Sequence, residues 1–178
     1  LVHWRQLPHA IEIDDHGHIW SGSAVVDENN TSGFGKDGVA PIVAAYTYAG
    51  RFVEPKQPFT QAIAYSVDRG RTMVKYDGNP VLGNQTGGGG DRDPKLLWHE
   101  PTGQWVMVLY LDSEPRRLGF FTSPDLKNWT KQSETTGFFE CPDMFALPVD
   151  GDASNTKWVL LAAGFALSSR GRRGSGGV

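Results

Sequence analysis

The sequence has almost no cysteine, no long apolar run and very little net charge. Cys141 is its one cysteine, which excludes an internal disulfide and a cysteine-based zinc site. No run of 18 apolar residues occurs, so no helix is expected to span a membrane. A net charge of −3 gives no electrostatic signature of a nucleic-acid or anionic-membrane partner. What remains is a chain of 178 residues, about the size of one domain.

The start of the chain also lacks familiar features. It has no initiator methionine and no charged segment followed by an apolar one, so no signal peptide is visible. The chain opens on Leu1-Val2-His3-Trp4, which is typical of the middle of an element. We therefore expect it to be a piece of a longer protein.

Glycine, proline and aromatic residues are abundant instead. With 22 glycines and 11 prolines, turn signals recur too often for long helices. Short segments rich in β-branched and aromatic residues lie between these turns, and no window of about 11 residues has a helical stripe. The sequence therefore predicts an all-β fold. The expected strands are Ile19–Val26, Pro41–Tyr48, Gln61–Ser66, Lys95–Trp98, Trp105–Leu111, Leu118–Thr122 and Trp158–Ala163.

The chain also contains a loose internal repeat. Residues 121–132 resemble residues 65–76, and the opening residues resemble those around Trp129. The aligned residues Trp4, Met73 and Trp129 lie roughly 60 residues apart, which leaves room for about four short strands in each unit. This spacing favours a β-propeller, of which the chain would hold the last strand of one blade, two full blades and the start of a fourth. A twisted β-sandwich with coincidental spacing is the alternative.

Each predicted blade begins with a polar strand. The first strand of a propeller blade lines the central channel, so polar residues of different blades meet there. Two carboxylates stand at such positions: Asp93, in an Arg-Asp-Pro triplet, and Glu140, in a Glu-Cys-Pro triplet. Glycosidic cleavage requires a pair of carboxylates of this kind. Acidic residues near proline are also ordinary turn signals, so the pattern alone leaves both interpretations open.

The neighbours of the two carboxylates favour different protonation states. Glu140 follows Phe138 and Phe139, and apolar surroundings favour the protonated form of a carboxyl, as a general acid needs. Asp93 follows Arg92, whose cation favours the ionised form if the two side chains lie within reach. We therefore expect one neutral acid and one anion at the same site.

Weaker signals point in several directions. The segment Trp20-Ser-Gly-Ser could hold a sugar through its indole and hydroxyls, or could be an ordinary strand with a core aromatic residue. The GxGxxG spacing at residues 33–38 opens no helix, and glycines 87–90 lack the Lys-Ser/Thr of a P-loop, so we expect no nucleotide site and a flexible loop at 87–90. His16 and His18 are more typical of a solvated loop than of a metal site.

Seven short segments, in a fixed order, carry a resemblance to a known family. They are residues 3–8 (HWRQLP), 17–27 (GHIWSGSAVVD), 29–35 (NNTSGFG), 61–68 (QAIAYSVD), 79–81 (NPV), 92–95 (RDPK) and 140–143 (ECPD). Together they resemble glycoside hydrolase family 32, the β-fructofuranosidases that include levanases, exo-inulinases and invertases.

The resemblance implies a fold and an activity. It implies a five-bladed β-propeller catalytic domain, of which residues 1–164 would supply about two to three blades. It further implies retaining hydrolysis of terminal non-reducing β-D-fructofuranosyl residues in fructans or sucrose, with no metal and no cofactor. Fructan or sucrose is then the expected partner, rather than nucleic acid or a membrane. Polymeric substrates suggest that the intact protein is secreted or periplasmic.

The resemblance also implies roles for individual residues. Glu140 matches the general acid/base of the family. Asp93 matches the aspartate that grips fructose hydroxyls and stabilises the oxocarbenium-like transition state. Substrate-binding or positioning roles are implied for Trp20, Ser21, Arg92 and Asp143.

Two departures from the family pattern limit the expected activity. The nucleophilic aspartate of the family lies in a Trp-Met-Asn-Asp-Pro-Asn-like motif that this sequence lacks, so we assign no nucleophile and expect the chain alone to be inactive. Residues 165–178 resemble no blade strand and are expected to form a Gly/Arg-rich tail outside the family domain.

Two rival functions remain. One is a non-catalytic sugar-binding propeller, and the other is a related five-bladed glycosidase that acts on arabinan. The joint presence of the Trp20-Ser-Gly-Ser and Glu140-Cys-Pro motifs disfavours both.

Overall fold

A computed structural model describes residues 3–164 of the chain. The predicted tail at 165–178 lies outside the described residues. The described part consists of β-strands and loops, and its helices are two 3-10 turns of three residues each, Gly50–Phe52 and Glu100–Thr102. The all-β prediction is therefore confirmed.

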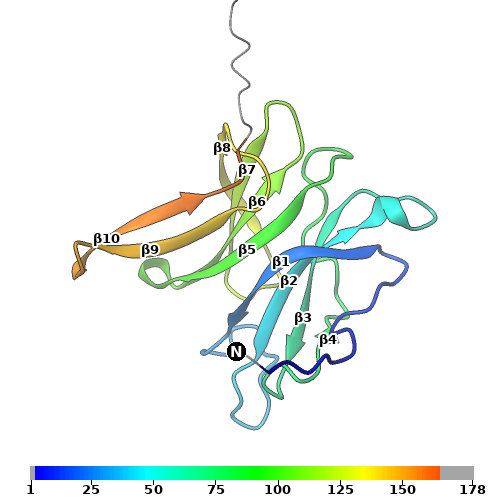
Figure 1. Ribbon diagram of the computed structural model, residues 1–178, viewed down its shortest axis with the longest axis horizontal. Helices are drawn as coiled ribbons and strands as arrows, with labels where there is room; N and C mark the ends of the chain where they lie inside the picture. Colours follow the sequence, from blue (N-terminus) through cyan, green and yellow to red (C-terminus); the bar gives the residue numbers. More distant parts are fainter. Residues whose placement is uncertain (1–2, 165–178) are drawn as a thin grey trace, which may run out of the picture.

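The first four strands form one antiparallel sheet, in the order β1-β2-β3-β4 (Figure 1). β2 lies inside this sheet, and its run of small, β-branched and aromatic residues is buried along most of its length. β1 is an edge strand whose residues are half-buried or exposed. The strand bounds are β1 (His18–Val26), β2 (Ile42–Ala49), β3 (Thr60–Ser66) and β4 (Val74–Lys75).

The next four strands form a second antiparallel sheet of the same topology, in the order β5-β6-β7-β8. β6 is an inner strand and is mostly buried, whereas β8 is an outer edge and almost wholly exposed. The strand bounds are β5 (Arg92–His99), β6 (Gln104–Leu111), β7 (Arg117–Ser123) and β8 (Thr130–Thr136).

A third, two-stranded antiparallel sheet follows, formed by β9 (Asp143–Val149) and β10 (Asp152–Leu161). Seven of the strands correspond to predicted ones, and β4, β8 and β9 were not predicted. β4 is only two residues long, and the sequence of β8, Thr-Lys-Gln-Ser-Glu-Thr-Thr, has no apolar alternation. A strand that lies at the outer edge of a sheet can be polar throughout, which removes the signal on which the prediction depended.

The internal repeat corresponds to an equivalent turn in the two large sheets. Ser66 donates to Asp68 (2.7 Å) in the turn between β3 and β4, and Ser123 donates to Asp125 (3.1 Å) in the turn between β7 and β8. In both turns the aspartate also accepts backbone N–H bonds from residues further along the chain. Met73 and Trp129 of the sequence repeat directly precede β4 and β8.

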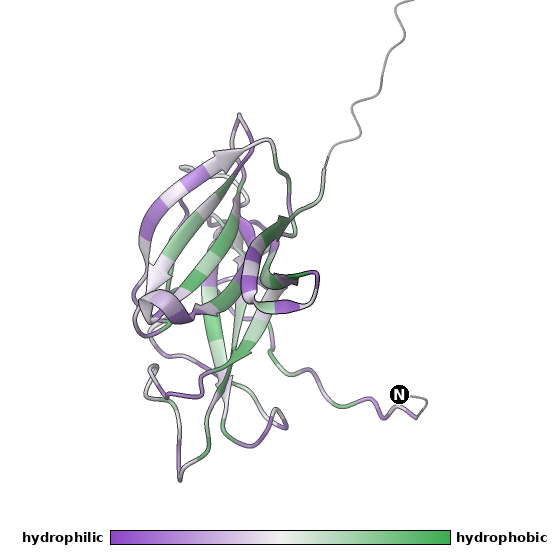
Figure 2. Ribbon diagram, turned by 90° about the vertical axis from the view of Figure 1, so that its left-hand side faces the viewer, coloured by the Kyte–Doolittle hydropathy of each residue, from purple (hydrophilic) through white to green (hydrophobic). Residues whose placement is uncertain are grey.

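The hydrophobic core lies between the sheets. Val43 and Ile63 of the first sheet pack against Met107 and Leu109 of the second in one cluster. The opposite face of the second sheet, around Tyr110, packs against the third sheet. Figure 2 shows the same distribution, with hydrophobic residues on the strands and largely hydrophilic loops.

The three sheets are thus stacked in chain order, and their first strands lie side by side. β1 lies beside β5, and β5 lies beside β9 (Figure 1). A two-layer sandwich does not have a third sheet behind the second, so the arrangement favours successive propeller blades. Within residues 3–164 the sheets do not close into a ring, and the number of blades in a complete ring is not defined by them.

Candidate active site

A pocket of about 330 Å³ opens where the first strands of the three sheets meet. Its walls come from the middle of β1, the start of β5 and the segment that leads into β9. Sequence positions that are about 70 and 50 residues apart are therefore brought to one place. The lining residues are Ser21, Gly22, Ser23, Asp93, Pro94, Lys95, Cys141, Pro142 and Asp143.

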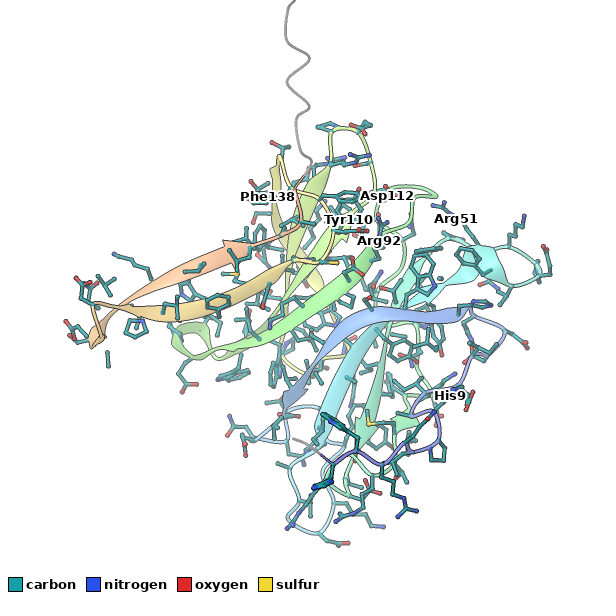
Figure 3. All side chains as sticks on the ribbon, viewed as in Figure 1. His9, Arg51, Arg92, Tyr110, Asp112 and Phe138 are labelled. Carbon is teal, nitrogen blue, oxygen red and sulfur yellow. The ribbon has the colours of Figure 1, made fainter. Side chains whose placement is uncertain are left out.

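Arg92, the first residue of β5, holds the carboxylate of Glu140. Its Nε and Nη2 atoms lie 3.0 Å and 2.7 Å from Glu140 Oε2. The guanidinium carbon lies 4.7 Å from the centre of the Tyr110 ring, so the planar cation also rests on an aromatic face. In Figure 3 the Arg92 and Tyr110 side chains lie together near the start of β5. Glu140 directly precedes Cys141, which lines the pocket.

Asp93 is buried, and its backbone has an unusual conformation. Its φ of +63° lies in the left-handed region, at an irregularity in the pairing of β5 with β6. Aspartate tolerates this region better than most residues, and the turn directs its side chain into the pocket. Its backbone N–H donates to Thr47 Oγ1 (3.1 Å), and its Oδ2 accepts the backbone N–H of Cys141 (3.0 Å). The carboxylate is therefore fixed by the segment that carries Glu140.

Buried polar groups behind Asp93 support this conformation. The Thr47 hydroxyl donates to Gln61 Oε1 (2.8 Å), and Gln61 Nε2 donates to the carbonyl of Asp91 (2.8 Å). Thr47, Gln61 and Asp91 are all fully buried. Because unsatisfied polar groups are costly in such a place, this chain of hydrogen bonds holds β2, β3 and the head of β5 in one arrangement.

Cys141 stands between the two carboxylates. Its thiol lies 3.6 Å from Asp93 Oδ2, and its φ of +56° is also left-handed. Partial burial raises the pKa of the Cys141 thiol, and the negative charges of Asp93 and Glu140 raise it further. The side chain is consequently a neutral thiol at pH 7 and is poorly suited to act as a nucleophile.

The walls of the pocket also contain an ion pair, between β5 and β9, and a close backbone approach, in β1. Lys95 Nζ lies 2.7 Å from Asp143 Oδ1. Gly22 lies at a β-bulge in β1, where a Cβ atom would come within 1.9 Å of the Ala45 carbonyl oxygen. Only glycine fits there, and its presence leaves Ser21 and Ser23 on the pocket wall.

The structure brings five of the six sequence-predicted site residues to the pocket or to its edge, and Trp20 lies beside them. Trp20 does not line the pocket itself. Its indole packs against Phe52 (ring centres 5.3 Å apart) and Phe59 (5.1 Å), and it remains 38% exposed. The five at the pocket or its edge are Ser21, Arg92, Asp93, Glu140 and Asp143.

The expected surroundings of Glu140 differ from those found. Its carboxylate was expected among apolar side chains and instead accepts two hydrogen bonds from Arg92. Arg92 does lie within reach of Asp93, with 3.9 Å between Arg92 Nε and Asp93 Oδ2. It lies closer to Glu140, however. Phe139 packs beside Tyr110, and these two rings lie under the guanidinium of Arg92 rather than around the carboxylate of Glu140. Although burial on its own lowers the pKa of Arg92, the hydrogen bonds and charge of Glu140 raise it above its usual value.

The loop at glycines 87–90, which was expected to be flexible, makes several hydrogen bonds to neighbouring side chains. Asn84 Oδ1 accepts the N–H of Gly88 (2.8 Å), and its Nδ2 donates to the carbonyl of Gly89 (2.9 Å). Asp112 Oδ2 accepts the N–H of Gly90 (2.9 Å). The sequence reasoning missed Asp112, because no motif marks it and its position near Arg92 depends on the pairing of β5 with β6.

His16, one of the two histidines for which no metal site was expected, contacts Tyr48 and Asp14. The His16 ring stacks on Tyr48 (5.2 Å), and the backbone N–H of His16 donates to Asp14 (2.9 Å). Across the part of the chain that the structure describes, no group of three or more His, Cys, Asp or Glu side chains could hold a metal ion. No helix among residues 3–164 is long and apolar enough to cross a bilayer.

Comparison with known proteins identifies the family of the chain. The family model described as "Glycosyl hydrolases family 32 N-terminal domain" matches residues 1–175. The chain belongs to glycosyl hydrolase family 32. Its similarity to the levanase of Bacillus subtilis is 47% identity over 167 residues, covering 90% of this chain and 23% of the levanase. It is 41% identical over 186 residues to the extracellular exo-inulinase inuE of Aspergillus niger, covering 90% of this chain and 34% of that protein.

A solved family 32 structure shares the fold. The fructofuranosidase of Schwanniomyces occidentalis, complexed with fructose, superposes with a TM-score of 0.74 at 38% identity. The superposition covers 89% of this chain and 31% of the fructofuranosidase. The chain thus spans about a quarter to a third of the length of the family 32 relatives it matches.

Proposed function

We propose that the protein of which this chain is a part hydrolyses terminal non-reducing β-D-fructofuranosyl residues in fructans or sucrose, with retention of configuration. The observation that carries the proposal is the joint contact of Arg92 with both carboxylates at one pocket, 2.7 Å from Glu140 and 3.9 Å from Asp93. Retaining cleavage of a sugar requires an acid/base carboxylate and a nucleophilic carboxylate; Glu140 would supply the first, and Asp93 would be the anion that stabilises the transition state beside it.

In the proposed mechanism each carboxylate has its own task. Glu140, which is about one-third exposed, donates a proton to the glycosidic oxygen as the bond to the anomeric carbon breaks. Asp93 stays ionised, accepts hydrogen bonds from fructose hydroxyls and stabilises the positive charge that develops on the ring. A third carboxylate, outside the motifs of this sequence, attacks the anomeric carbon and forms a fructosyl ester. Water then hydrolyses the ester, and Glu140 takes the proton from that water.

The other pocket residues would bind the sugar. Ser21 offers a hydroxyl on the wall formed by β1, and the Lys95–Asp143 ion pair offers a donor and an acceptor on the opposite wall. Trp20, with its exposed indole edge next to Ser21, would contact the part of the substrate that extends out of the pocket. A complete five-bladed ring would enclose the pocket from the remaining sides.

The substrate class and location follow from the relatives. Proteins named levanase and exo-inulinase are 47% and 41% identical to this chain, and the similar solved structure is a fructofuranosidase complexed with fructose. One of these relatives is described as extracellular, which supports secretion of the protein to which this chain belongs. No metal or cofactor has a part in the proposed reaction.

The test is fructose release by the full-length protein from levan, inulin and sucrose. We expect Glu140→Gln and Asp93→Asn to lower kcat by about 10²–10⁴-fold, the usual range for removal of an acid/base group. Exposed Glu28, in the loop after β1, provides the matched control Glu28→Gln, which should retain full activity. The anomer released first, followed by NMR, should be the β form. Fructan binding without turnover, or full activity of Glu140→Gln, would contradict the proposal.

The 178-residue chain alone provides a second comparison. It should release no fructose above the level of its own Glu140→Gln variant, because its sequence lacks the nucleophile motif. Turnover by this chain would show that a described carboxylate serves as the nucleophile.

A further inference from the structure

Asp112, directly after β6, has a carboxylate that is held from two sides. Its Oδ2 accepts the N–H of Gly90 (2.9 Å), and its Oδ1 accepts the hydroxyl of Tyr110 (3.2 Å). The backbone N–H of Asp112 donates to the buried carboxylate of Asp91 (2.9 Å). These contacts fix both the main chain and the side chain of a residue that does not line the pocket.

The two residues that hold Asp112, Gly90 and Tyr110, also hold Arg92, each through a different group of atoms. The Gly90 carbonyl accepts a hydrogen bond from Arg92 Nη1 (2.8 Å), and the Tyr110 ring lies under the guanidinium. Arg92 in turn makes its two short contacts with Glu140. Figure 3 shows Asp112, Tyr110 and Arg92 side by side at this point. A continuous set of contacts therefore leads from Asp112 to Glu140.

Asp112 also shares the charge of Arg92. Three carboxylates surround this cation: Glu140 at 2.7 Å, Asp112 at 3.8 Å and Asp93 at 3.9 Å. A cation that faces three anions stabilises the ionised form of each anion less than a cation that faces a single anion does. Asp112 thus places a further negative charge beside the cation that holds Glu140.

Other charged groups surround this cluster. Arg51, in the 3-10 turn Gly50–Phe52 that follows β2, lies 3.9 Å from Asp112, and the guanidinium of Arg116 lies over the Phe139 ring at 4.9 Å. Cys141 is a neutral thiol beside Asp93, and Tyr110 is neutral because burial, and after it the charge of Asp112, raises its pKa to about 12. Among the described residues, the carboxylates in ion-pair contact with Arg92 are those of Glu140, Asp112 and Asp93, and the buried carboxylate of Asp91 accepts the backbone N–H of Asp112.

We propose that Asp112 is a positioning residue for Glu140, and that it acts through Arg92. It accepts hydrogen bonds from the Gly90 N–H and the Tyr110 hydroxyl, and so holds the two residues whose carbonyl and ring orient the guanidinium; its negative charge also offsets part of the guanidinium charge that faces Glu140. This role rests on the proposed function, in which Glu140 is the acid/base.

The decisive variant is Asp112→Asn in the full-length protein. The amide oxygen can still accept the Gly90 N–H, so the variant removes the charge and leaves the loop in place. We expect kcat to fall about tenfold with little change in KM, and the basic limb of the pH profile to move to lower pH by about 0.5–1 unit, because one unit charge several Å away is lost. Asp112→Glu keeps the charge, so it should leave the basic limb in place. Asp77→Asn, at an exposed position after β4, is the matched control and should change neither quantity.

A second measurement decides the inference even if the full-length protein hydrolyses no fructoside. With ¹³C-labelled glutamate carboxyls, the Glu140 resonance is assigned by its absence in Glu140→Gln, and its titration is compared in the parent and in Asp112→Asn. A midpoint that moves to lower pH in Asp112→Asn supports the role. An unchanged midpoint, or a loss of activity accompanied only by lower thermal stability, overturns it. Absence of turnover in the parent would refute the proposed function, and the titration would still test Asp112.

Discussion

At the scale of the residue, the candidate site depends on how differently two carboxylates are held. Asp93 is buried in a left-handed conformation, and its carboxylate accepts a backbone N–H. Such a conformation costs about 1–3 kcal/mol and persists only where the surroundings determine it. Glu140 is held by one side chain, that of Arg92, and is about one-third exposed. The fixed carboxylate of Asp93 suits a role as an anion in the site, whereas the more accessible carboxylate of Glu140 suits transfer of a proton.

The thiol of Cys141 provides a test of the charge at this site. Partial burial raises its pKa, and the charge and hydrogen bond of Asp93 raise it further. The reactive thiolate should therefore form only at a pH above that of an ordinary cysteine. Because the sequence has one cysteine, mass spectrometry of the iodoacetamide-treated chain follows this residue alone. We expect slow alkylation at pH 7 and a rate that rises at higher pH than for a cysteine peptide.

Asp93→Asn is the matched variant for the alkylation experiment. It removes the nearest negative charge, so the curve of rate against pH should move toward that of the peptide. A parent protein that is alkylated at pH 7 as fast as the peptide would contradict the inference that partial burial and the charge of Asp93 raise the pKa of the Cys141 thiol.

At the scale of the element, one hydroxyl joins the middle of β1 to the start of β5. Ser23 Oγ donates to the carbonyl of Pro94 (2.9 Å) and accepts the N–H of Leu96 (2.8 Å). The two strands belong to different sheets, and the pairing of β5 with β6 is irregular between Arg92 and Lys95, so a side chain from β1 takes the place of a backbone partner. Asp93 precedes this contact by one residue, so the contact also determines where the buried carboxylate lies.

Removal of that hydroxyl should weaken the junction between the two sheets. Ser23→Ala leaves a backbone carbonyl and N–H without their partner, and we expect the free energy of unfolding to fall by about 1–3 kcal/mol. Urea denaturation of the chain, followed by tryptophan fluorescence, measures the change. Ser133→Ala, on the exposed strand β8, should change stability by less than about 0.5 kcal/mol. Equal effects of the two substitutions would show that the Ser23 contact has no special role.

The sequence predicted seven strands, in which burial imposes a period of two or a continuous apolar run, but it missed β9, whose Met144 packs against the second sheet. It could not predict β8, which is polar throughout at an outer edge. The motifs identified Asp93 and Glu140 and led to Arg92. They did not predict that Arg92 makes its short contacts with Glu140. That choice depends on Tyr110 and on the Gly90 carbonyl, which the pairing of β5 with β6 brings to the guanidinium. Contacts of this kind arise between strands and leave no local pattern.

At the scale of the whole molecule, the third sheet differs from the other two. It has two strands where the others have four, and it leaves large apolar side chains exposed. Beside it lies a second pocket, of about 420 Å³, with Val106, Phe120, Met144 and Trp158 among its walls. An apolar surface of this kind is unusual on a monomeric protein and favours association. The exposed apolar residues of this sheet are Leu147, Trp158 and Leu161.

The isolated 178-residue chain should therefore associate through this sheet. We expect its apparent mass in light scattering after size exclusion to rise with concentration, and the dye ANS to bind to it strongly. The double substitution Leu147→Lys with Leu161→Lys places two charges on the face of this sheet turned away from the second sheet and should return the chain to a monomer that binds little dye. The full-length protein should bind little dye without any substitution, since further chain can cover the same sheet.

Val74→Lys is the control for the added charge. Val74 is 50% exposed on β4, away from the third sheet, so its substitution should leave association unchanged. If Val74→Lys disperses the chain as well as the double variant does, net charge and not this surface governs association. A chain that is monomeric at every concentration and binds no dye would show that the third sheet is covered by the chain itself, and the candidate site would then be part of a self-contained unit.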